Sequence, residues 1–176
     1  MSVIQTNRLI LRQYNRSDFD EIYSILSDPV TMSFWPKPFD KEQVTHWIER
    51  NLRSYEEHGF GRWLVVLKEK DVIIGDCGVV RSEINNKLEY DLGYIIDKDY
   101  WNLGFGTEAA EACLSYAFKE LHLDSICINM PTNHSASRRV AELLGLSLES
   151  EFVNSKNRNI LTYLYRIDKE EFIANQ

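Results

Sequence analysis

The chain has 176 residues, 44% of them hydrophobic and 12% aromatic, which is enough to bury the core of one domain without a metal or a disulfide. Acidic residues (27) outnumber Lys and Arg (20) and give a formal net charge of −7, which argues against an extended nucleic-acid footprint and favours a cationic or amine partner. Three widely spaced cysteines, Cys77, Cys113 and Cys127, fit neither a disulfide framework nor a zinc motif, so we interpret them as reduced core residues.

No composition break or linker interrupts the sequence, so we expect one domain over residues 1–176. No run of about 18 apolar residues is present, and Arg8 and Arg12 fall inside an alternating N-terminal pattern. We therefore expect a cytoplasmic protein with neither a secretion signal nor a membrane partner.

The first third of the chain predicts a strand and two helices around an aromatic loop. Apolar and polar residues alternate over 8–14 as on a half-buried strand, and helical spacing follows over 17–27, where Asp28-Pro29 ends the helix. Residues 30–39 form a loop rich in aromatic side chains and proline. A capping box at Asp40 and Gln43 begins a second helix that ends at Gly59.

The remaining elements predict the sheet. Strand patterns cover 62–67, 72–80 and 87–96, with hairpin breaks between them; a helix follows Gly106 and a further strand covers 125–130. A helix over 135–144, closed by Gly145, and two strands over 146–153 and 159–167 complete the chain. The strand, helix and strand from residue 87 to residue 130 require a parallel right-handed crossover. We expect an α/β (α+β) fold with a single mixed, mostly antiparallel sheet and helices on both faces.

A glycine turn stands between the strand over 87–96 and the helix after it. Gly104 and Gly106 allow positive φ and a close approach to the backbone, while the first amides of the helix have no partner within it. Such amides, at the positive end of a helix, bind a phosphate or pyrophosphate without a basic side chain. The alternative interpretation is a plain tight turn.

Several segments in order carry a family resemblance. The sequences DLGY (91–94), DKDYW (97–101) and GFGTEA (104–109) resemble the coenzyme A signature of the GNAT N-acetyltransferases. TNRLILR (6–12), SDPV (27–30) and ASRRVAELLGL (136–146) extend the likeness over nearly the whole chain. The chain is most similar to the branch that includes the ribosomal-protein N-terminal acetyltransferases, which implies a GNAT-like fold.

The resemblance implies an acyltransferase that moves an acetyl group from acetyl-CoA to a primary amine by direct attack through a tetrahedral intermediate, without a metal. The acceptor would be a small molecule or a protein N-terminal α-amine, and the protein a monomer or a homodimer with no nucleic-acid partner. The pyrophosphate would bind the amides of residues 103–107. The expected contacts to the cofactor come from the strand end, the glycine turn and the later helix: Ile95, Ile96, Trp101, Asn102, Leu103, Gly104, Phe105, Gly106, Thr107, Asn133, Ser137 and Arg138.

Two positions depart from the branch pattern. His134 stands where the branch tends to have Asn, with Asn133 one residue earlier, which puts an Asn contact to the pantetheine arm in question. Asp91 stands where Glu is more usual, so its carboxylate is drawn back by about one methylene.

The transfer needs a base for the amine, a site for the oxyanion and an acid for the thiolate. Strand alternation puts Glu89, Asp91 and Gly93 on one face, and we assign Asp91 as the base with Glu89 second. A solvated polar strand face would give the same pattern. The amides of Ile95 and Ile96 would meet the thioester oxygen if the strand bulges or splays there.

Candidate acids are Ser137 and a tyrosine of the last strand, Tyr163 or Tyr165. The competing roles are capping of its helix for Ser137 and core packing for the tyrosines. Arg138 and Arg139 either reach the 3′-phosphate of the cofactor or are ordinary exposed helix charges.

The acceptor pocket is expected at the aromatic loop and the helix after it, with Phe34, Trp35 and Trp47 as binding residues. These aromatic side chains could equally cover the core. Two rival functions keep the same fold: a non-catalytic acyl-CoA-binding or regulatory module, and a transferase for a longer acyl group.

Overall fold

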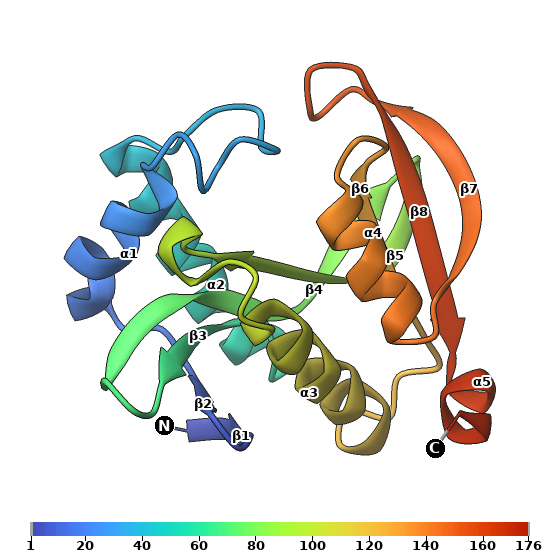
Figure 1. Cartoon of the computed structure of the whole chain (residues 1–176), viewed down its shortest axis with the longest axis horizontal. Coiled ribbons are helices and arrows are strands. Elements are labelled where there is room, and N and C mark those ends of the chain that lie inside the picture. The colour runs from blue at the N-terminus through green and yellow to red at the C-terminus, as the bar shows by residue number, and fades with distance from the viewer. Residues whose placement is uncertain (1, 176) are drawn as a thin grey trace.

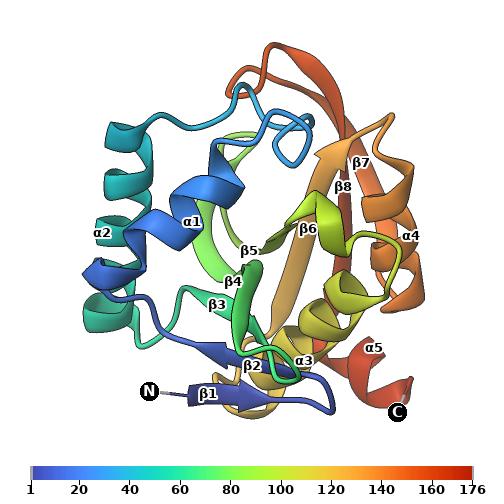
Figure 2. The same ribbon diagram turned by 60° about the vertical axis from the view of Figure 1, so that its left-hand side comes forward.

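An eight-stranded sheet runs through the protein in the order β1-β2-β3-β4-β5-β6-β8-β7, and helices cover both of its faces (Figures 1 and 2). The computed structural model describes residues 2–175. The strands are β1 (Ser2–Gln5), β2 (Leu9–Arg12), β3 (Arg62–Leu67), β4 (Val72–Ile84), β5 (Lys87–Ile96), β6 (Ser125–Pro131), β7 (Ser147–Asn154) and β8 (Ile160–Asp168). The helices are α1 (Phe19–Leu26), α2 (Lys41–His58), α3 (Phe105–Lys119), α4 (Ser135–Leu143) and α5 (Lys169–Ala174), with short 3₁₀ turns η1 (Arg16–Asp18) and η2 (Lys98–Tyr100).

The sheet confirms the expected mixed topology. β5 and β6 run parallel, joined by α3, and the other neighbouring strands within residues 2–175 pair antiparallel. β3 and β5 have the predicted bounds, and β4 extends to Ile84 because the hairpin turn lies at Asn85 and Asn86, both with positive φ. The α2 capping box at Asp40 and Gln43 is present, and Gly59 ends the helix at φ 80°.

Some predicted bounds were wrong. The predicted strand over 8–14 is shorter, because Arg12 turns to pair with Asp18 at 2.8 Å. The predicted helix over 17–27 divides into η1 and α1, since Asn15 caps the 3₁₀ turn. α3 begins at Phe105, before Gly106 rather than after it, and ends at Lys119. β1 and α5 were not predicted.

Two apolar layers hold the helices on the sheet. On one face α1 and α2 pack over β3, β4 and β5 through a cluster that includes Ile22, Trp47, Leu64 and Ile95. On the other face α3 packs over the same strands through a larger cluster that includes Trp63, Cys77, Leu92 and Cys113. Cys77, Cys113 and Cys127 are all buried, as expected of reduced core cysteines.

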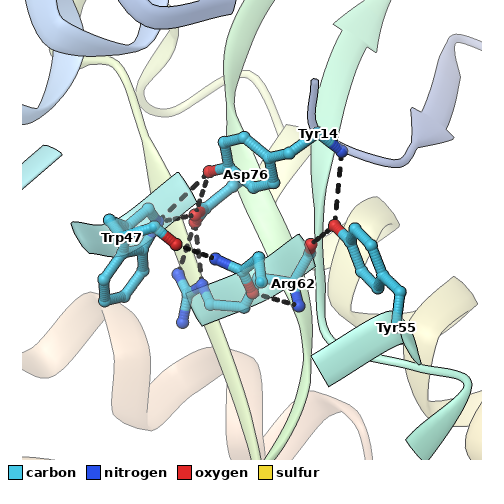
Figure 3. A network of polar contacts seen from close by, with 6 residues as sticks. Tyr14, Trp47, Tyr55, Arg62 and Asp76 are labelled. Atoms are coloured by element: carbon cyan, nitrogen blue, oxygen red, sulfur yellow. Dashed lines mark hydrogen bonds and ion pairs between the residues drawn. The ribbon is translucent and has the colours of Figure 1, made fainter. Parts of the chain in front are cut away.

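A buried ion pair lies between the sheet and α2. Asp76 of β4 accepts hydrogen bonds from Arg62 (Nε 3.0 Å, Nη2 2.5 Å), from the Tyr14 hydroxyl (2.6 Å) and from the Trp47 indole (2.8 Å), as Figure 3 shows. The Arg62 and Asp76 side chains are 4% and 0% exposed, so each charge depends on the other. Four donors on one carboxylate fix where Trp47, and therefore the middle of α2, sits over the sheet.

Glycine makes room for this pair. A Cβ built on Gly93 of β5 would lie 2.2 Å from Nη1 of Arg62. The Arg62 guanidinium therefore lies against bare backbone of β5, two residues from Asp91 on the same strand face.

Removing the negative charge of the buried pair should destabilise the fold strongly. Asp76→Asn leaves the buried Arg62 charge uncompensated, and we expect a loss of about 3–5 kcal/mol in the free energy of unfolding. Urea unfolding measures it. Asp71→Asn is the matched control, since Asp71 is exposed at the β3–β4 turn and Asn tolerates its positive φ of 53°. Equal midpoints for the two variants would contradict the role given to the pair.

Candidate active site

The site begins where β5 and β6 separate. Their pairing has one registered residue pair, Asp91 with Cys127, whereas β5 stays paired with β4 as far as Ile96. The amide of Asp97 donates to the Ile74 carbonyl on the β4 side (2.8 Å). Strand alternation therefore directs the amides of Tyr94 and Ile96 to the opposite side, into the gap that β6 has left, and the Ile95 amide toward β4.

This gap is part of a cleft of about 1150 Å³. The cleft passes from the glycine turn, along the end of β5, to the loop over residues 30–39 and the hairpin between β7 and β8. Most of the proposed site residues line it: Phe34, Trp35, Trp47, Asp91, Ile95, Ile96, Trp101, Asn102, Gly104, Phe105, Gly106, Thr107 and Ser137.

The glycine turn opens α3 toward the cleft. Gly104 is the N-cap at φ 81°, and among the described residues no side chain caps the first turn. The first helical hydrogen bond runs from the Glu108 amide to the Gly104 carbonyl (3.0 Å). The amides of Phe105, Gly106 and Thr107 therefore have no hydrogen-bond acceptor within the helix, as at a helix N-terminus that binds an anion.

Contacts with β5 and with the β1–β2 turn hold the glycine turn in place. The Trp101 indole donates to the Ile96 carbonyl (2.7 Å), which ties the turn to the end of β5. Arg8 donates to the Leu103 carbonyl (2.9 Å), pairs with Glu108 (2.6 Å) and lies 4.3 Å from the centroid of the Phe105 ring. A Cβ on Gly106 would lie 3.4 Å from the Tyr94 ring, so α3 starts close against β5.

Asp91 is a partly buried carboxylate whose hydrogen-bond donors belong to Asn129. Asn129 of β6 donates to its Oδ1 at 3.1 Å. Burial raises the pKa of Asp91 to about 6, although Arg62, Asn129 and Arg50 oppose the shift. A carboxylate with this pKa is ionised at neutral pH yet accepts a proton more readily than an exposed Asp.

A pair of hydroxyl groups in the cleft joins β5 to α4. Tyr94 donates to Oγ of Ser137 at 3.2 Å, and burial raises the pKa of the tyrosine to about 12. His134, not Ser137, caps α4: its Nδ1 accepts from the Ser137 amide (3.1 Å). Burial lowers the pKa of His134, so its ring is neutral at pH 7, and it stacks on Phe34 with centroids 3.7 Å apart.

The aromatic loop lines the cleft and also covers the core. Trp35 packs edge-on against Phe39 and Trp47. Trp47 is only 6% exposed, and its indole N–H donates a hydrogen bond to Asp76. Phe34 contributes its carbonyl to Asn157 of the β7–β8 hairpin (2.9 Å). These aromatic side chains therefore line the cleft and cover the core at the same time.

Six of the candidates lie outside the cleft lining. Glu89 pairs with Arg166 of β8 (2.9 Å). Tyr165 belongs to the core cluster and its hydroxyl donates to Glu142 (3.2 Å), while Tyr163 packs against the same cluster. Arg138 faces Glu142 at 3.6 Å, whereas its neighbour Arg139 lines the cleft. The remaining two are Leu103, whose carbonyl binds Arg8, and Asn133, whose place in the lining is taken by His134.

Two polar cleft residues, Arg62 and Asn129, were missed by the sequence analysis. Arg62 could have been noticed, because Arg62 and Asp76 are lone opposite charges in two neighbouring apolar strands, which is typical of a buried ion pair. Asn129 could not, since its place in the cleft depends on where β5 and β6 diverge.

Comparison with known proteins identifies the family. The model of the acetyltransferase (GNAT) domain matches residues 8–147, so the chain belongs to the GNAT acetyltransferases. Among curated relatives, YkkB of Bacillus subtilis is 30% identical over 90% of this chain and 92% of its own length. YnaD of the same organism, named as an N-acetyltransferase, is 28% identical over 96% and 98%. The expected acyltransferase class is confirmed.

Solved structures share the fold. A GNAT-family acetyltransferase from Bacillus anthracis is 26% identical, with a TM-score of 0.79 over 95% of this chain and 98% of that one. RimL, a ribosomal L7/L12 α-N-protein acetyltransferase in complex with coenzyme A, gives 0.79 at 15% identity over 96% and 98%. A Vibrio cholerae spermidine N-acetyltransferase in complex with CoA and spermine gives 0.77 at 18% identity over 96% and 99%.

Over residues 2–175, none of the helices has the length and apolar character that a membrane crossing requires. Within the same residues, no cluster of three or more His, Cys, Asp or Glu side chains is arranged to hold a metal ion.

The raised pKa of Asp91 predicts a cost in stability. The pKa lies above its ordinary value of 3.8, so ionisation destabilises the fold; the penalty is absent below about pH 4 and complete above about pH 6. Asp91→Asn should therefore raise the free energy of unfolding at pH 8 by up to about 3 kcal/mol and change it little at pH 4. Urea unfolding at both pH values measures this. Asp99→Asn, at an exposed position, should show no such gain. A destabilised Asp91→Asn protein at pH 8 would contradict the assignment.

Substitution of the glycines in the turn should abolish cofactor binding. Gly104→Val puts a branched Cβ at φ 81°, and Gly106→Val puts one against the Tyr94 ring, so we expect either variant to lose acetyl-CoA binding. Calorimetric titration measures the affinity, and Gly59→Val is the control for strain, since Gly59 has φ 80° at the far end of α2. Unchanged affinity in the Gly104 and Gly106 variants would show that the turn does not bind the cofactor.

Proposed function

We propose that the protein transfers an acetyl group from acetyl-CoA to a primary amine in the cleft between β5 and β6. The observation that carries the proposal is the placement of an uncapped helix start and a carboxylate of raised pKa on one cleft, joined by a strand edge that has lost its neighbour. A cytoplasmic location, the expected setting for such chemistry, remains part of this proposal.

The residues present fit acetyl-CoA. The amides of residues 103–107 suit the pyrophosphate, and the backbone of β5 beyond Asp91 faces the gap with groups that can pair with the amides of the pantetheine arm. Arg139 lines the same cleft and is the better placed of the two α4 arginines for the 3′-phosphate. Acetyl-CoA would supply the activated acetyl thioester. The amides of Tyr94 and Ile96 would donate to its carbonyl oxygen as negative charge develops there.

Asp91 receives the proton of the attacking amine. The nitrogen forms a bond to the thioester carbon, the carbon–sulfur bond breaks, and a proton passes from nitrogen to the Asp91 carboxylate. Ser137, backed by the Tyr94 hydroxyl, is the candidate donor to the departing thiolate. Glu89, Tyr163 and Tyr165 have partners elsewhere and take no step.

Positioning of the two reactants is expected to lower the activation barrier more than proton transfer does. Holding the two reactants together supplies roughly 7–11 kcal/mol of the barrier, against about 3–5 kcal/mol for a general base. Acceptor basicity matters as well: at pH 7 an α-amine is about 14% neutral, whereas a lysine side chain is only about 0.04% neutral. A base with a pKa of about 6 suits an amine of low basicity.

Turnover of an amine panel tests the function. Purified protein, acetyl-CoA and the panel, which includes amino acids, peptides with free N-termini and spermidine, are incubated while free thiol and acetylated amine are measured. We expect thiol release that requires an amine. Tight acetyl-CoA binding without turnover on any amine would favour the non-catalytic module, and turnover with longer acyl-CoA alone would favour the longer-chain transferase.

The base assignment predicts a pH profile. Asp91 acts as a base when ionised, so kcat/KM should rise with pH through about 6. Asp91→Asn should lower kcat by roughly 10²- to 10⁴-fold with unchanged acetyl-CoA affinity, because positioning survives. Glu89→Gln should leave the profile in place. Wild-type rates in the Asp91 variant would place the base elsewhere.

A further inference from the structure

We propose that the acceptor is a small amino acid whose carboxylate binds Arg50 while its amine faces Asp91. Arg50 would then be the residue that determines acceptor specificity. This inference rests on the proposed function and names its substrate class.

Arg50 is a cation of the cleft that the protein leaves without a counterion. It lies on α2, lines the cleft and is exposed there. Its guanidinium stands 4.8 Å from the Trp47 ring centroid, and among residues 2–175 it makes no ion pair and no hydrogen bond with a side chain or the backbone. A guanidinium held over an aromatic ring with its N–H groups unused suits a planar carboxylate.

The underlying network fixes this cation. Two guanidinium groups contact the Trp47 ring: that of Arg50 and that of Arg62, whose guanidinium carbon is 5.1 Å from the ring centroid. The Asp76 carboxylate pairs with Arg62 and accepts a hydrogen bond from the Trp47 indole N–H, so it does not serve as a counterion for Arg50 (Figure 3). The cleft walls partly desolvate Arg50, and together with the Arg62 charge this lowers its pKa, although Asp76 and Asp91 oppose the shift.

The charge of the cleft has the opposite sign to that of the chain. Apart from Arg62, whose charge Asp76 neutralises, its lining carries four cations, Arg50, Arg81, Arg139 and Lys156, and two anions, Glu83 and Asp91. The protein as a whole has a formal net charge of −7. A cleft of this sign repels a polyamine and attracts a molecule that brings its own negative charge.

Arg50 and Asp91 line the same cleft: Arg50 lies by Trp47, as Arg62 does, and Arg62 lies against Gly93, two residues from Asp91. Each charge shifts the pKa of the other: Arg50 lowers that of Asp91, and Asp91 raises that of Arg50. An ammonium group beside a carboxylate is the charge pattern of an amino acid, and it complements a carboxylate beside a guanidinium. The edge-packed rings of Trp35 and Trp47 line the same end of the cleft and offer an apolar wall to a side chain.

The acceptor end is bridged, which favours a free amino acid over a protein N-terminus. Asn157, at the β7–β8 hairpin, donates to the Phe34 carbonyl (2.9 Å), and Phe34 stacks on His134. All three residues line the cleft. The loop over residues 30–39 and the hairpin tip, which lie on the same side of the molecule in Figure 1, are thus joined beside the site. A peptide with an acidic first residue offers a carboxylate as well and is the alternative source of the anion.

The experiment compares the common amino acids with their amides in wild-type protein and three variants. Arg50→Gln removes the cation, Arg50→Lys keeps the charge without the planar fork, and Arg53→Gln removes an exposed cation of the same helix that does not line the cleft. Dividing each wild-type kcat/KM by the variant value cancels the different basicities of acid and amide. Short peptides with Asp or Glu first, and spermidine, complete the panel.

We expect Arg50→Gln to lower kcat/KM by about 10- to 100-fold for amino acids, mainly through KM, and to leave the amides unchanged. Arg50→Lys should recover part of the loss, and Arg53→Gln should match the wild type. Equal losses for acids and amides, or a wild type that prefers spermidine, would overturn the inference while the acetyltransferase activity stands. A preference confined to acidic peptides would overturn the choice of a free amino acid.

A binding measurement separates this inference from the proposed function. Calorimetry with CoA-saturated protein and N-acetyl amino acids, the expected products, requires no turnover. Binding to the wild type that Arg50→Gln abolishes would support the carboxylate site even if no amine were acetylated, an outcome that would refute the proposed function. Absence of binding to the wild type would overturn the carboxylate site.

Discussion

β5 and β6 are in register at Asp91 and Cys127, and the gap beyond that pair is the constraint on which the whole site depends. A parallel pair that continued to Ile96 would use the Tyr94 and Ile96 amides in the sheet and close the space between the strands. Because β8 holds β6 over its full length and β4 holds β5, neither strand loses its own support when they separate. Unpaired backbone groups thus become available between two central strands, while each of these strands stays hydrogen-bonded to its other neighbour.

Three chemically different surfaces meet at this gap. The start of α3 brings unpaired amides, the middle of β5 brings a carboxylate that burial has made a better base, and α2 brings a cation. The Asp76 carboxylate connects the last two, because it places Trp47 under Arg50 and holds Arg62 against Gly93. A buried ion pair is a costly way to stabilise a fold, and its position suggests a role in fixing the site.

Periodicity made most of the fold predictable. β3 and β5 were predicted to the residue because their apolar patterns end at turn residues, and α2 carries both of its end signals, Asp40 and Gly59. β1 and α5 were missed because four and six residues are too few to show a period, although Asp168 and Glu171 of α5 form a capping box. The glycine turn and Asp91 were also readable, since each depends on local spacing.

The rest of the site depends on distant pairing. Glu89 and Asp91 share a strand face, yet Arg166, 77 residues from Glu89, pairs with one and leaves the other for the cleft. Likewise, His134 takes the capping role that sequence gave to Ser137, which leaves the serine hydroxyl for Tyr94. Such partner choices follow from the order of strands and helices in space, which no local pattern contains.

A crystal structure of the protein with acetyl-CoA would show where the cofactor lies relative to the gap between β5 and β6. We expect the pyrophosphate within hydrogen-bonding distance of the amides of residues 103–107 and the thioester between β5 and β6, near Asp91. A cofactor that lies outside this gap, or a pyrophosphate bound by side chains away from the start of α3, would contradict this expectation.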